Sequence, residues 1–209
     1  RTKDSEEKKE KLEKEITEHK RLKQEFQHRA DQATLIYKVG QRVSSKLELG
    51  ALLAESVTAV QETFNYYGVM LLLLDEDGQW LNLQAIAGGY SHIFPDTLRL
   101  KVGEGMIGQA AKTKKIQVSG NVTKDPYYVR KAEEITQSEL SIPIKSGDTV
   151  IGVLDFQSDK LNAFNESDVA AMETLSNQIA AAIENANLYE RSQEEIKERK
   201  RAEKELQEA

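Results

Sequence analysis

The stretch Leu140-Ser-Ile-Pro-Ile-Lys-Ser-Gly-Asp-Thr-Val-Ile-Gly-Val-Leu-Asp-Phe-Gln-Ser158 decides the fold. Two runs rich in apolar and β-branched residues, 140–145 and 149–158, flank the turn Ser146-Gly-Asp148. A short turn of this composition between two such runs predicts a β-hairpin. The centre of the chain is therefore expected to be a sheet.

Further strands are predicted on the N-terminal side of this hairpin. Apolar or alternating runs of strand length lie at residues 67–75, 80–87, 97–102 and 116–119. The first two are separated by a turn that contains the pair Asp77-Gly78, a strong hairpin signal. We therefore expect six short strands, with two antiparallel hairpins among them.

Two helices are predicted to flank these strands. Ser45-Lys-Leu-Glu48 matches a capping box, and the apolar residues from there to about Phe64 fall on one helical face, which is expected to lie on the sheet. Asn165, with Asp168 three residues on, caps a second helix. Because no helix breaker follows, this helix is expected to continue into the C-terminal end of the chain.

The two charged ends of the chain are similar in sequence. Ile16-Thr-Glu-His-Lys-Arg-Leu-Lys-Gln-Glu-Phe26 matches Ile196-Lys-Glu-Arg-Lys-Arg-Ala-Glu-Lys-Glu-Leu206 at five of eleven positions without gaps. Each copy places two apolar residues ten apart, which is one heptad plus three and therefore one seam of a coiled coil. The match is either a coincidence between two Glu/Lys-rich helices or a pair of connectors that enclose the core.

These ends are predicted to form coiled coils. A helix from about Asp4 to Ser44 would be roughly 60 Å long, and it is too polar to be stable alone, so it needs a partner helix. The residues predicted to form the seams of these coiled coils are Leu12, Ile16, His19, Phe26, Ile183, Ile196 and Leu206. A polar seam residue such as His19 costs stability and fixes the register.

Composition argues against several partners and chemistries. The 209 residues include 29 Lys and Arg interleaved with 35 Asp and Glu, for a net charge of −6, so no nucleic acid partner is expected. The longest apolar run, Val69–Leu74, is far shorter than the ~20 residues of a membrane span, and no direct membrane contact is expected. The absence of cysteine favours a reducing, cytoplasmic location. A start at Arg1 indicates a piece of a longer protein.

The motifs do not predict an enzyme. Gly103-Glu-Gly-Met-Ile-Gly108 has the dinucleotide-binding spacing, but the preceding strand alternates and only about residues 106–113 can form the next helix. We interpret these glycines as turn and helix-entry residues. His19, His28 and His92 have no partner at metal-ligand spacing, and no nucleophile can be paired with a base. A regulatory domain is expected, with no catalytic or metal-binding residues; a cofactor is not assigned.

A loop region rich in aromatic and apolar residues is the candidate ligand site. Long connections that carry such residues above a sheet commonly line a small-molecule pocket. The candidates are Tyr90, His92, Phe94, Met106, Ile107, Tyr127 and Tyr128 on the loops, opposite Leu140, Ile142 and Phe156 on strands. These side chains either line a pocket or close the core under the loops, and both interpretations predict burial.

The order of the elements and five short motifs resemble a GAF domain over roughly residues 36–188. The motifs are Val102-Gly-Glu-Gly-Met-Ile-Gly108, Asn121-Val-Thr-Lys-Asp-Pro-Tyr127, Ser138-Glu-Leu-Ser-Ile-Pro-Ile144, Val150-Ile-Gly-Val-Leu-Asp-Phe-Gln-Ser158 and Phe164-Asn-Glu-Ser-Asp168. The resemblance implies an α+β fold in which a six-stranded antiparallel sheet carries helices on one face and a loop-covered ligand pocket on the other. It also implies a parallel dimer made by the terminal helices, which are similar to the connectors that follow PAS domains in bacterial sensor kinases and cyclases.

The chain departs from some members of this family. Cyclic-nucleotide-binding members carry Asn-Lys and then Phe-x-x-x-Asp-Glu, whereas this chain has Asp159-Lys160 and then Phe164-x-x-x-Asp168-Val169. The resemblance implies a structural ion pair between Lys160 and Asp168, but cyclic nucleotide binding is not expected. Bilin-linking members and free methionine sulfoxide reductases need cysteine, which this chain lacks, so neither is expected.

Three parts are therefore predicted: an N-terminal signalling helix at 1–44, a GAF-like sensory domain at 45–188 and a C-terminal signalling helix at 189–209. The predicted function is a sensory and relay module of a multidomain bacterial protein, such as a histidine kinase of a two-component system. A small ligand in the pocket would change how the helices of the homodimer pack. The alternative is a ligand-free structural module for dimerisation and spacing.

Overall fold

A computed structural model describes residues 14–24, 27, 30, 46–130 and 135–208 of the chain. Residues 14–24, 27 and 30 are helical. Most of the predicted N-terminal helix, with its seam residues Leu12 and Phe26 and the capping residue Ser45, lies outside the described residues. The elements are α2 (Lys46–Phe64), β1 (Gly68–Leu74), β2 (Trp80–Gly88), η1 (Gly89–His92), β3 (Arg99–Lys101), α3 (Gly105–Thr113), β4 (Gln117–Ser119), η2 (Val122–Lys124), β5 (Ser138–Ser146), β6 (Thr149–Ser158) and α4 (Glu166–Glu208).

The strands form one six-stranded sheet in the order β3-β2-β1-β6-β5-β4, and every neighbouring pair is antiparallel. Both predicted hairpins are present as β1–β2 and β5–β6. The first and last hairpins meet at the centre, where β1 pairs with β6. The prediction of a six-stranded antiparallel sheet is therefore confirmed.

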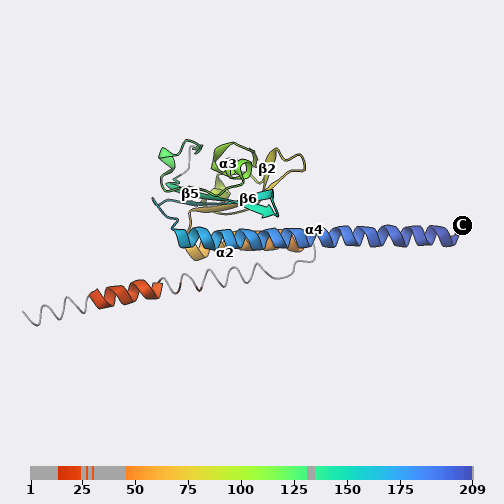
Figure 1. Cartoon of the computed structure of the whole chain (residues 1–209), viewed down its shortest axis with the longest axis horizontal. Coiled ribbons are helices and arrows are strands. Elements are labelled where there is room, and N and C mark those ends of the chain that lie inside the picture. Colours follow the sequence, from red (N-terminus) through yellow and green to blue (C-terminus); the bar gives the residue numbers. More distant parts are fainter. Residues whose placement is uncertain (1–13, 25–26, 28–29, 31–45, 131–134, 209) are drawn as a thin grey trace, which may run out of the picture.

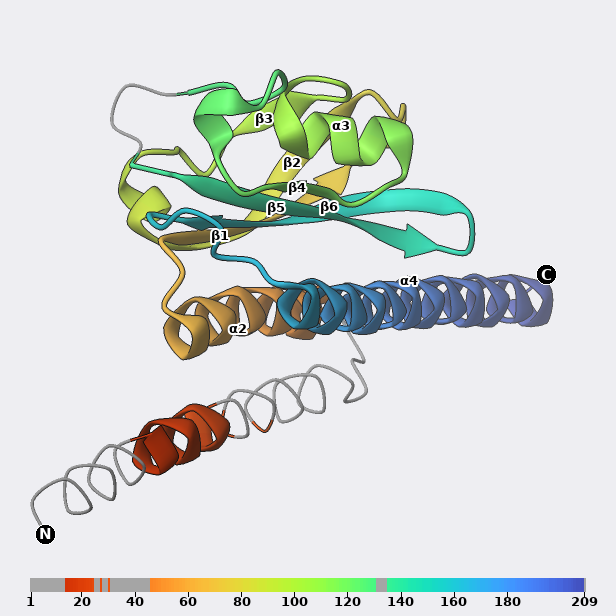
Figure 2. The ribbon, with the colours of Figure 1, turned by 60° about the vertical axis from the view of Figure 1, so that its left-hand side comes forward.

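The sheet separates two apolar layers. Helices α2 and α4 lie on one face, and the shorter α3 lies on the opposite face with the connecting loops (Figures 1 and 2). The strands alternate between the layers: in β1, Val69 and Leu71 pack toward α2 and α4, while Met70 and Leu72 pack toward α3. This alternation follows from the two-residue period of a strand, which points successive side chains to opposite faces.

Helix α4 is a single helix of 43 residues, about 65 Å long at 1.5 Å per residue. Its start has the predicted cap: the Asn165 side-chain oxygen accepts from the backbone N–H groups of Ser167 (2.8 Å) and Asp168 (3.0 Å), and the Asp168 carboxylate accepts from the Asn165 N–H (3.1 Å). The first part of α4 packs on the sheet, and its last part runs beyond the sheet (Figure 1). The predicted continuation into the C-terminal end is confirmed.

One residue assigned to the dimer seam lies elsewhere. Ile183 is buried in the layer between α4 and the sheet, together with Leu175 and Ile179. It cannot also face a second chain, so its assignment to the seam is corrected. By contrast, Ile196 is 43% exposed and Ile16 is 47% exposed.

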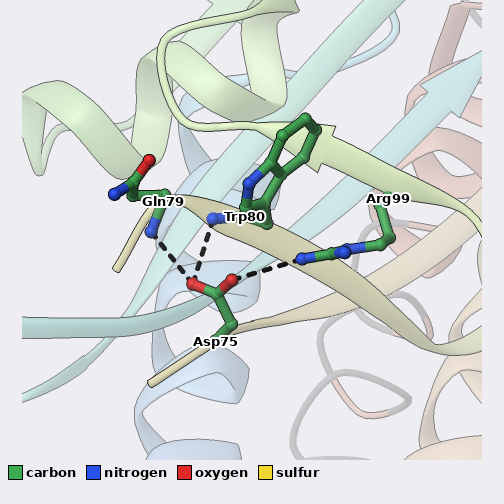
Figure 3. A network of polar contacts seen from close by, with 4 residues as sticks. All are labelled: Asp75, Gln79, Trp80 and Arg99. Carbon is green, nitrogen blue, oxygen red and sulfur yellow. Dashed lines mark hydrogen bonds and ion pairs between the residues drawn. The ribbon is translucent and has the colours of Figure 1, made fainter. Parts of the chain in front are cut away.

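A polar cluster fastens the β1–β2 turn to β3 at one end of the sheet (Figure 3). One Asp75 carboxylate oxygen accepts from the backbone N–H groups of Gln79 (2.9 Å) and Trp80 (3.1 Å), and the other lies 3.3 Å from the Arg99 guanidinium. That guanidinium also stacks over the Trp80 ring, 5.0 Å from its centre. These contacts hold the pKa of Asp75 below its ordinary value. The hydrogen bond from the Trp80 N–H has the largest effect, followed by that from the Gln79 N–H and by the charge of Arg99.

Among the described helices, none combines the length and the apolar character that a membrane crossing requires. Within the same described residues, no group of three or more His, Asp or Glu side chains is arranged to hold a metal ion.

Candidate functional site

The candidate site is a cavity of about 90 Å³ on the α3 face of the sheet, opposite α2 and α4. Its wall comes from the segment that leads into β3, from the turn and first residues of α3, and from the floor strands β1, β5 and β6. The lining residues are Met70, Phe94, Leu98, Leu100, Glu104, Gly105, Met106, Ile107, Tyr128, Val129, Glu139 and Gln157. The charged lining side chains among the described residues are both acidic, Glu104 and Glu139.

The glycine turn Gly103–Gly108 shapes one wall of the cavity. Gly103 (φ 93°) and Gly105 (φ 67°) adopt left-handed conformations that favour glycine, and α3 begins at Gly105. Gly108 has no side chain because the turn folds back on it: an added Cβ would lie 2.5 Å from the Lys101 carbonyl oxygen and 2.9 Å from the Gly103 nitrogen. The interpretation of these glycines as turn and helix-entry residues is confirmed.

A chain of hydrogen bonds runs beneath the cavity. The Tyr90 hydroxyl lies 2.6 Å from the Thr136 hydroxyl, which donates to the Gln157 side-chain oxygen (2.7 Å). The Gln157 amide nitrogen donates to Asp155 (3.0 Å). Ser141 donates to the other oxygen of Asp155 (2.6 Å) and lies 3.3 Å from Glu139. All these side chains are buried, and buried polar groups of this kind are kept by their mutual hydrogen bonds.

The structure brings four of the predicted pocket residues together around the cavity: Phe94, Met106, Ile107 and Tyr128. Tyr90 lies behind the wall, fully buried and packed edge-on against the rings of Tyr67 and Phe94. A role in ligand binding stays a prediction for all of them.

The other two loop candidates do not line the cavity. His92 is exposed at the end of η1, and Tyr127 is 49% exposed. Tyr127 directly precedes the lining residue Tyr128, and His92 lies two residues before the lining residue Phe94, but neither contributes to the surface of the cavity.

The three strand candidates, Leu140, Ile142 and Phe156, lie on the wrong face for a pocket role. They pack with α2 and α4 in the other apolar layer. Leu140 and Phe156 are paired neighbours on β5 and β6, so one side of the hairpin carries both. Because side chains alternate along a strand, Glu139 and Gln157, not these apolar residues, face the cavity. Their assignment to the pocket is corrected.

Sequence reasoning missed the polar floor. Glu139, Ser141, Asp155 and Gln157 alternate with the apolar residues of β5 and β6, and Thr136 lies just before β5. The available signal was the alternation itself: a polar set at every second position of two predicted strands that are otherwise apolar. Polar residues at those positions usually indicate a solvent-facing side, and here α3 and the loops cover them.

The ion pair predicted between Lys160 and Asp168 is not formed between these two described residues. Lys160 is exposed, and it forms two hydrogen bonds through its backbone. Its carbonyl oxygen accepts from the Ser138 hydroxyl (2.7 Å), and its N–H donates to the Ser158 hydroxyl (3.2 Å). The Asp168 carboxylate caps the start of α4 instead. The capping role accounts for an acidic residue at this position.

Known proteins resemble this chain over its central part. The sequence pattern of the GAF domain matches residues 46–184. GAF domain-containing protein A of Dictyostelium discoideum is 32% identical over 118 residues, which are 56% of this chain and 70% of that protein. The Nif-specific regulatory protein of Azospirillum lipoferum is 29% identical over 125 residues, which are 57% of this chain but only 20% of that protein.

A solved structure with a similar fold is an enzyme. The free methionine-R-sulfoxide reductase of Neisseria meningitidis, solved in complex with its substrate, is 25% identical, with a TM-score of 0.67 over 77% of this chain and 90% of that chain. This neighbour overturns the prediction of a regulatory domain that is not an enzyme, because the same fold carries catalysis. The prediction rested on the motifs of other enzyme classes and on the absence of cysteine, whereas activity depends on the site residues that a fold holds.

The sheet order, helices α2 and α4 on one face, and the cavity beside α3 on the other face agree with the motifs quoted from the sequence. The expectation that all helices lie on one face is corrected, since α3 lies on the cavity side. The GAF pattern also matches well over half of the residues. The chain belongs to the GAF domain family.

Proposed function

We propose that this chain is the sensory module of a larger signalling protein, that it binds a small molecule in the α3-face cavity, and that it passes the signal on through α4 in a homodimer. GAF domains are typically sensory or regulatory modules, and the similarity to a Nif-specific regulatory protein fits this role. The observation that carries the proposal is the buried polar floor of the cavity, since apolar packing alone needs no Glu139 or Gln157 there.

The cavity sets the size and the character of the ligand. One water-sized probe needs about 10–15 Å³, so a cavity of about 90 Å³ accommodates a molecule of roughly six to nine non-hydrogen atoms. One side is apolar, with Met70, Leu98 and Ile107, and the floor is polar. The acidic lining favours a ligand that donates hydrogen bonds and disfavours an anion.

Strand β5 supports the proposed route of the signal. It lies against α3 on one face and α4 on the other. Glu139 on this strand lines the cavity, while the Pro143 carbonyl accepts from Ser176 of α4 (3.3 Å) and Ser146 donates a hydrogen bond to Glu184 of α4. A ligand that moves β5 therefore acts directly on α4, and two arrangements of α4 that differ in ligand affinity would make a switch.

The end of α4 supports the proposed dimer. Beyond the sheet, the helix carries Leu188 (62% exposed), Tyr189 (45% exposed) and Ile196 on an otherwise charged surface. A single polar helix of this kind needs a partner to be stable. In a parallel pair of α4 helices from two copies of this chain, Ile196 lies next to Ile196 of the second copy. Ile16 and His19 form the corresponding seam between the two N-terminal helices.

A ligand-free spacer that only dimerises is the alternative function. Both functions require the terminal helices to form the dimer. They differ in whether the cavity binds a ligand, which it would not do in a spacer. Binding therefore separates the two functions.

The cavity proposal predicts that Leu100→Trp abolishes binding. Leu100 is a half-buried lining residue on β3, and an indole in its place fills the space that the ligand needs. A ligand at a concentration 100 times its dissociation constant adds about 2.7 kcal/mol to the free energy of unfolding, which raises Tm by roughly 5 to 10 °C. Native mass spectrometry and a thermal-shift screen of small amides, amino acids and purine bases measure this change in Tm.

The matched control is Leu161→Trp, which adds the same side chain at an exposed position outside the cavity. It is expected to keep every shift seen with the unaltered chain. If no compound shifts Tm and no small molecule co-purifies, the spacer function is correct and the sensor proposal is wrong.

The dimer proposal predicts a disulfide between two copies of Ile196→Cys. The chain contains no cysteine, so this substitution gives a unique thiol. A parallel seam brings the two Cα atoms within the roughly 4.4–6.8 Å that a disulfide requires. Glu198→Cys, two residues on and about 200° around the helix, is the control and should cross-link poorly. A monomer at tens of micromolar by analytical ultracentrifugation, with no Ile196→Cys cross-link, would rule out the dimer.

A further inference from the structure

The hydrogen bonds beneath the cavity have one direction. Thr136 has one hydroxyl hydrogen, and it donates this hydrogen to the Gln157 side-chain oxygen. The Tyr90 hydroxyl must therefore be the donor in its 2.6 Å contact with Thr136. Gln157 in turn donates to the Asp155 carboxylate, which accepts on both oxygens.

Asp155 fixes the orientation of the Gln157 side-chain amide. If the amide were turned over, its oxygen would face the Asp155 oxygen, and two acceptors would meet with no hydrogen between them. Thr136 holds the oxygen end of the amide in place through its own hydrogen bond. Thr136 is fully buried and does not line the cavity, so it acts on the polar floor of the cavity through Gln157.

A side-chain amide has two N–H donors and two acceptor positions on its oxygen. Thr136 uses one acceptor position and Asp155 uses one donor, and these are the side-chain hydrogen bonds of this amide among the described residues. One N–H and one oxygen lone pair remain on Gln157, which lines the cavity. Directly opposite on β5 is Glu139, whose carboxylate oxygens are hydrogen-bond acceptors.

On the basis of the proposed ligand-binding function, we propose that Thr136 is the positioning residue that determines specificity, and that the cavity selects an uncharged carboxamide-type head group on a short apolar tail. A carboxamide accepts from the remaining N–H of Gln157 and donates to its remaining lone pair or to Glu139. A carboxylate has no hydrogen to donate to the remaining lone pair of Gln157. An alkylammonium has no acceptor for the Gln157 N–H, and its desolvation is costly.

Three probes with the same tail test this specificity: butanamide, butanoate and butylammonium. Their dissociation constants are measured by ligand-observed NMR with the full chain. The unaltered chain is expected to bind butanamide about three- to tenfold more tightly than either charged probe, the value of one hydrogen bond. Thr136→Val, which has the same shape without the hydroxyl, should lose most of this preference and change butylammonium binding less than about twofold.

Thr136→Ser keeps the hydroxyl and is expected to restore the preference. If Thr136→Val does not fold, Gln157→Leu replaces it in the same measurement. This variant removes the amide itself, so it should also lose the preference for butanamide. A direct readout is the pair of Gln157 side-chain NH₂ signals in a ¹H–¹⁵N spectrum, which should shift in Thr136→Val and return to their positions in Thr136→Ser. A general loss of packing would not give this rescue.

The outcomes separate this inference from the proposed function. Binding with no preference for butanamide, or a preference that Thr136→Val leaves unchanged, overturns the role of Thr136 while the cavity remains a ligand site. A preference for butylammonium overturns the carboxamide head group. If none of the three probes binds the unaltered chain at millimolar concentration and Leu100→Trp changes nothing in the wider screen, both the inference and the proposed function are wrong.

Discussion

Replacing Phe156 with alanine is expected to lower the free energy of unfolding by about 3–5 kcal/mol. Phe156 is fully buried in the layer between the sheet and helices α2 and α4, where its ring packs edge-on against Tyr66 with centres 5.9 Å apart. Truncation removes this apolar contact and leaves a cavity that the strands and helices cannot close. Chemical denaturation followed by circular dichroism measures the change.

The control for Phe156→Ala is Tyr127→Ala, an aromatic residue that is about half exposed. It is expected to change the free energy of unfolding by less than about 0.5–1 kcal/mol. Phe156 is on the helix face of the sheet and not in the cavity. Phe156→Ala should therefore keep the binding of any cavity ligand when binding is measured well below the Tm of the variant. If Phe156→Ala lowered the free energy of unfolding by less than about 1 kcal/mol and also abolished ligand binding, Phe156 would be a pocket residue.

Gly108→Ala is expected to destabilise the chain by about 1–3 kcal/mol, and so to lower Tm by roughly 2 to 12 °C. The added Cβ would meet two backbone atoms, the Lys101 oxygen at 2.5 Å and the Gly103 nitrogen at 2.9 Å, and neither can move without displacing the turn. Since this turn carries Gly105 and Met106 into the cavity wall, ligand binding should weaken as well. Differential scanning calorimetry and the thermal-shift screen measure the two effects.

Gly50→Ala is the matched control for Gly108→Ala. Gly50 lies on the exposed side of α2, and nothing is within 4 Å of an added Cβ. Because alanine is the better helix former, this substitution is expected to stabilise the chain by about 0.5–1 kcal/mol. The same chemical change thus has opposite signs at the two sites. An equal effect of both substitutions would show that the close backbone approach at Gly108 is not a constraint.

The strands and their order along the chain could be predicted because each depends on local signals. Turns with Gly and Asp separate the paired strands of both hairpins, and Asn165 with Asp168 marks the start of α4. The glycine turn before α3 was also predictable, since Gly103 and Gly105 need conformations that other residues avoid. The membership in the GAF family followed from the same local motifs in order.

The pocket was only partly predictable. Phe94, Met106, Ile107 and Tyr128 belong to segments whose position above the sheet follows from the fold, and they line the cavity. Leu140 and Phe156 were placed on the wrong side because the alternation of a strand separates two faces without saying which element covers each. Hydrophobicity alone favoured the apolar face as the pocket, although the large helices need that face for their own burial.

Local sequence therefore determined which residues form strands, turns and helix caps, because these depend on neighbours within a few positions. It also determined that Leu140 and Phe156 share one face of the β5–β6 hairpin and that Glu139 and Gln157 share the other. Only the tertiary structure decided that α2 and α4 cover the apolar face and that α3 covers the polar one. It also decided that Thr136 and Tyr90, 46 residues apart, meet beneath the cavity. These contacts join segments distant in the chain, and no local pattern encodes which of them will meet.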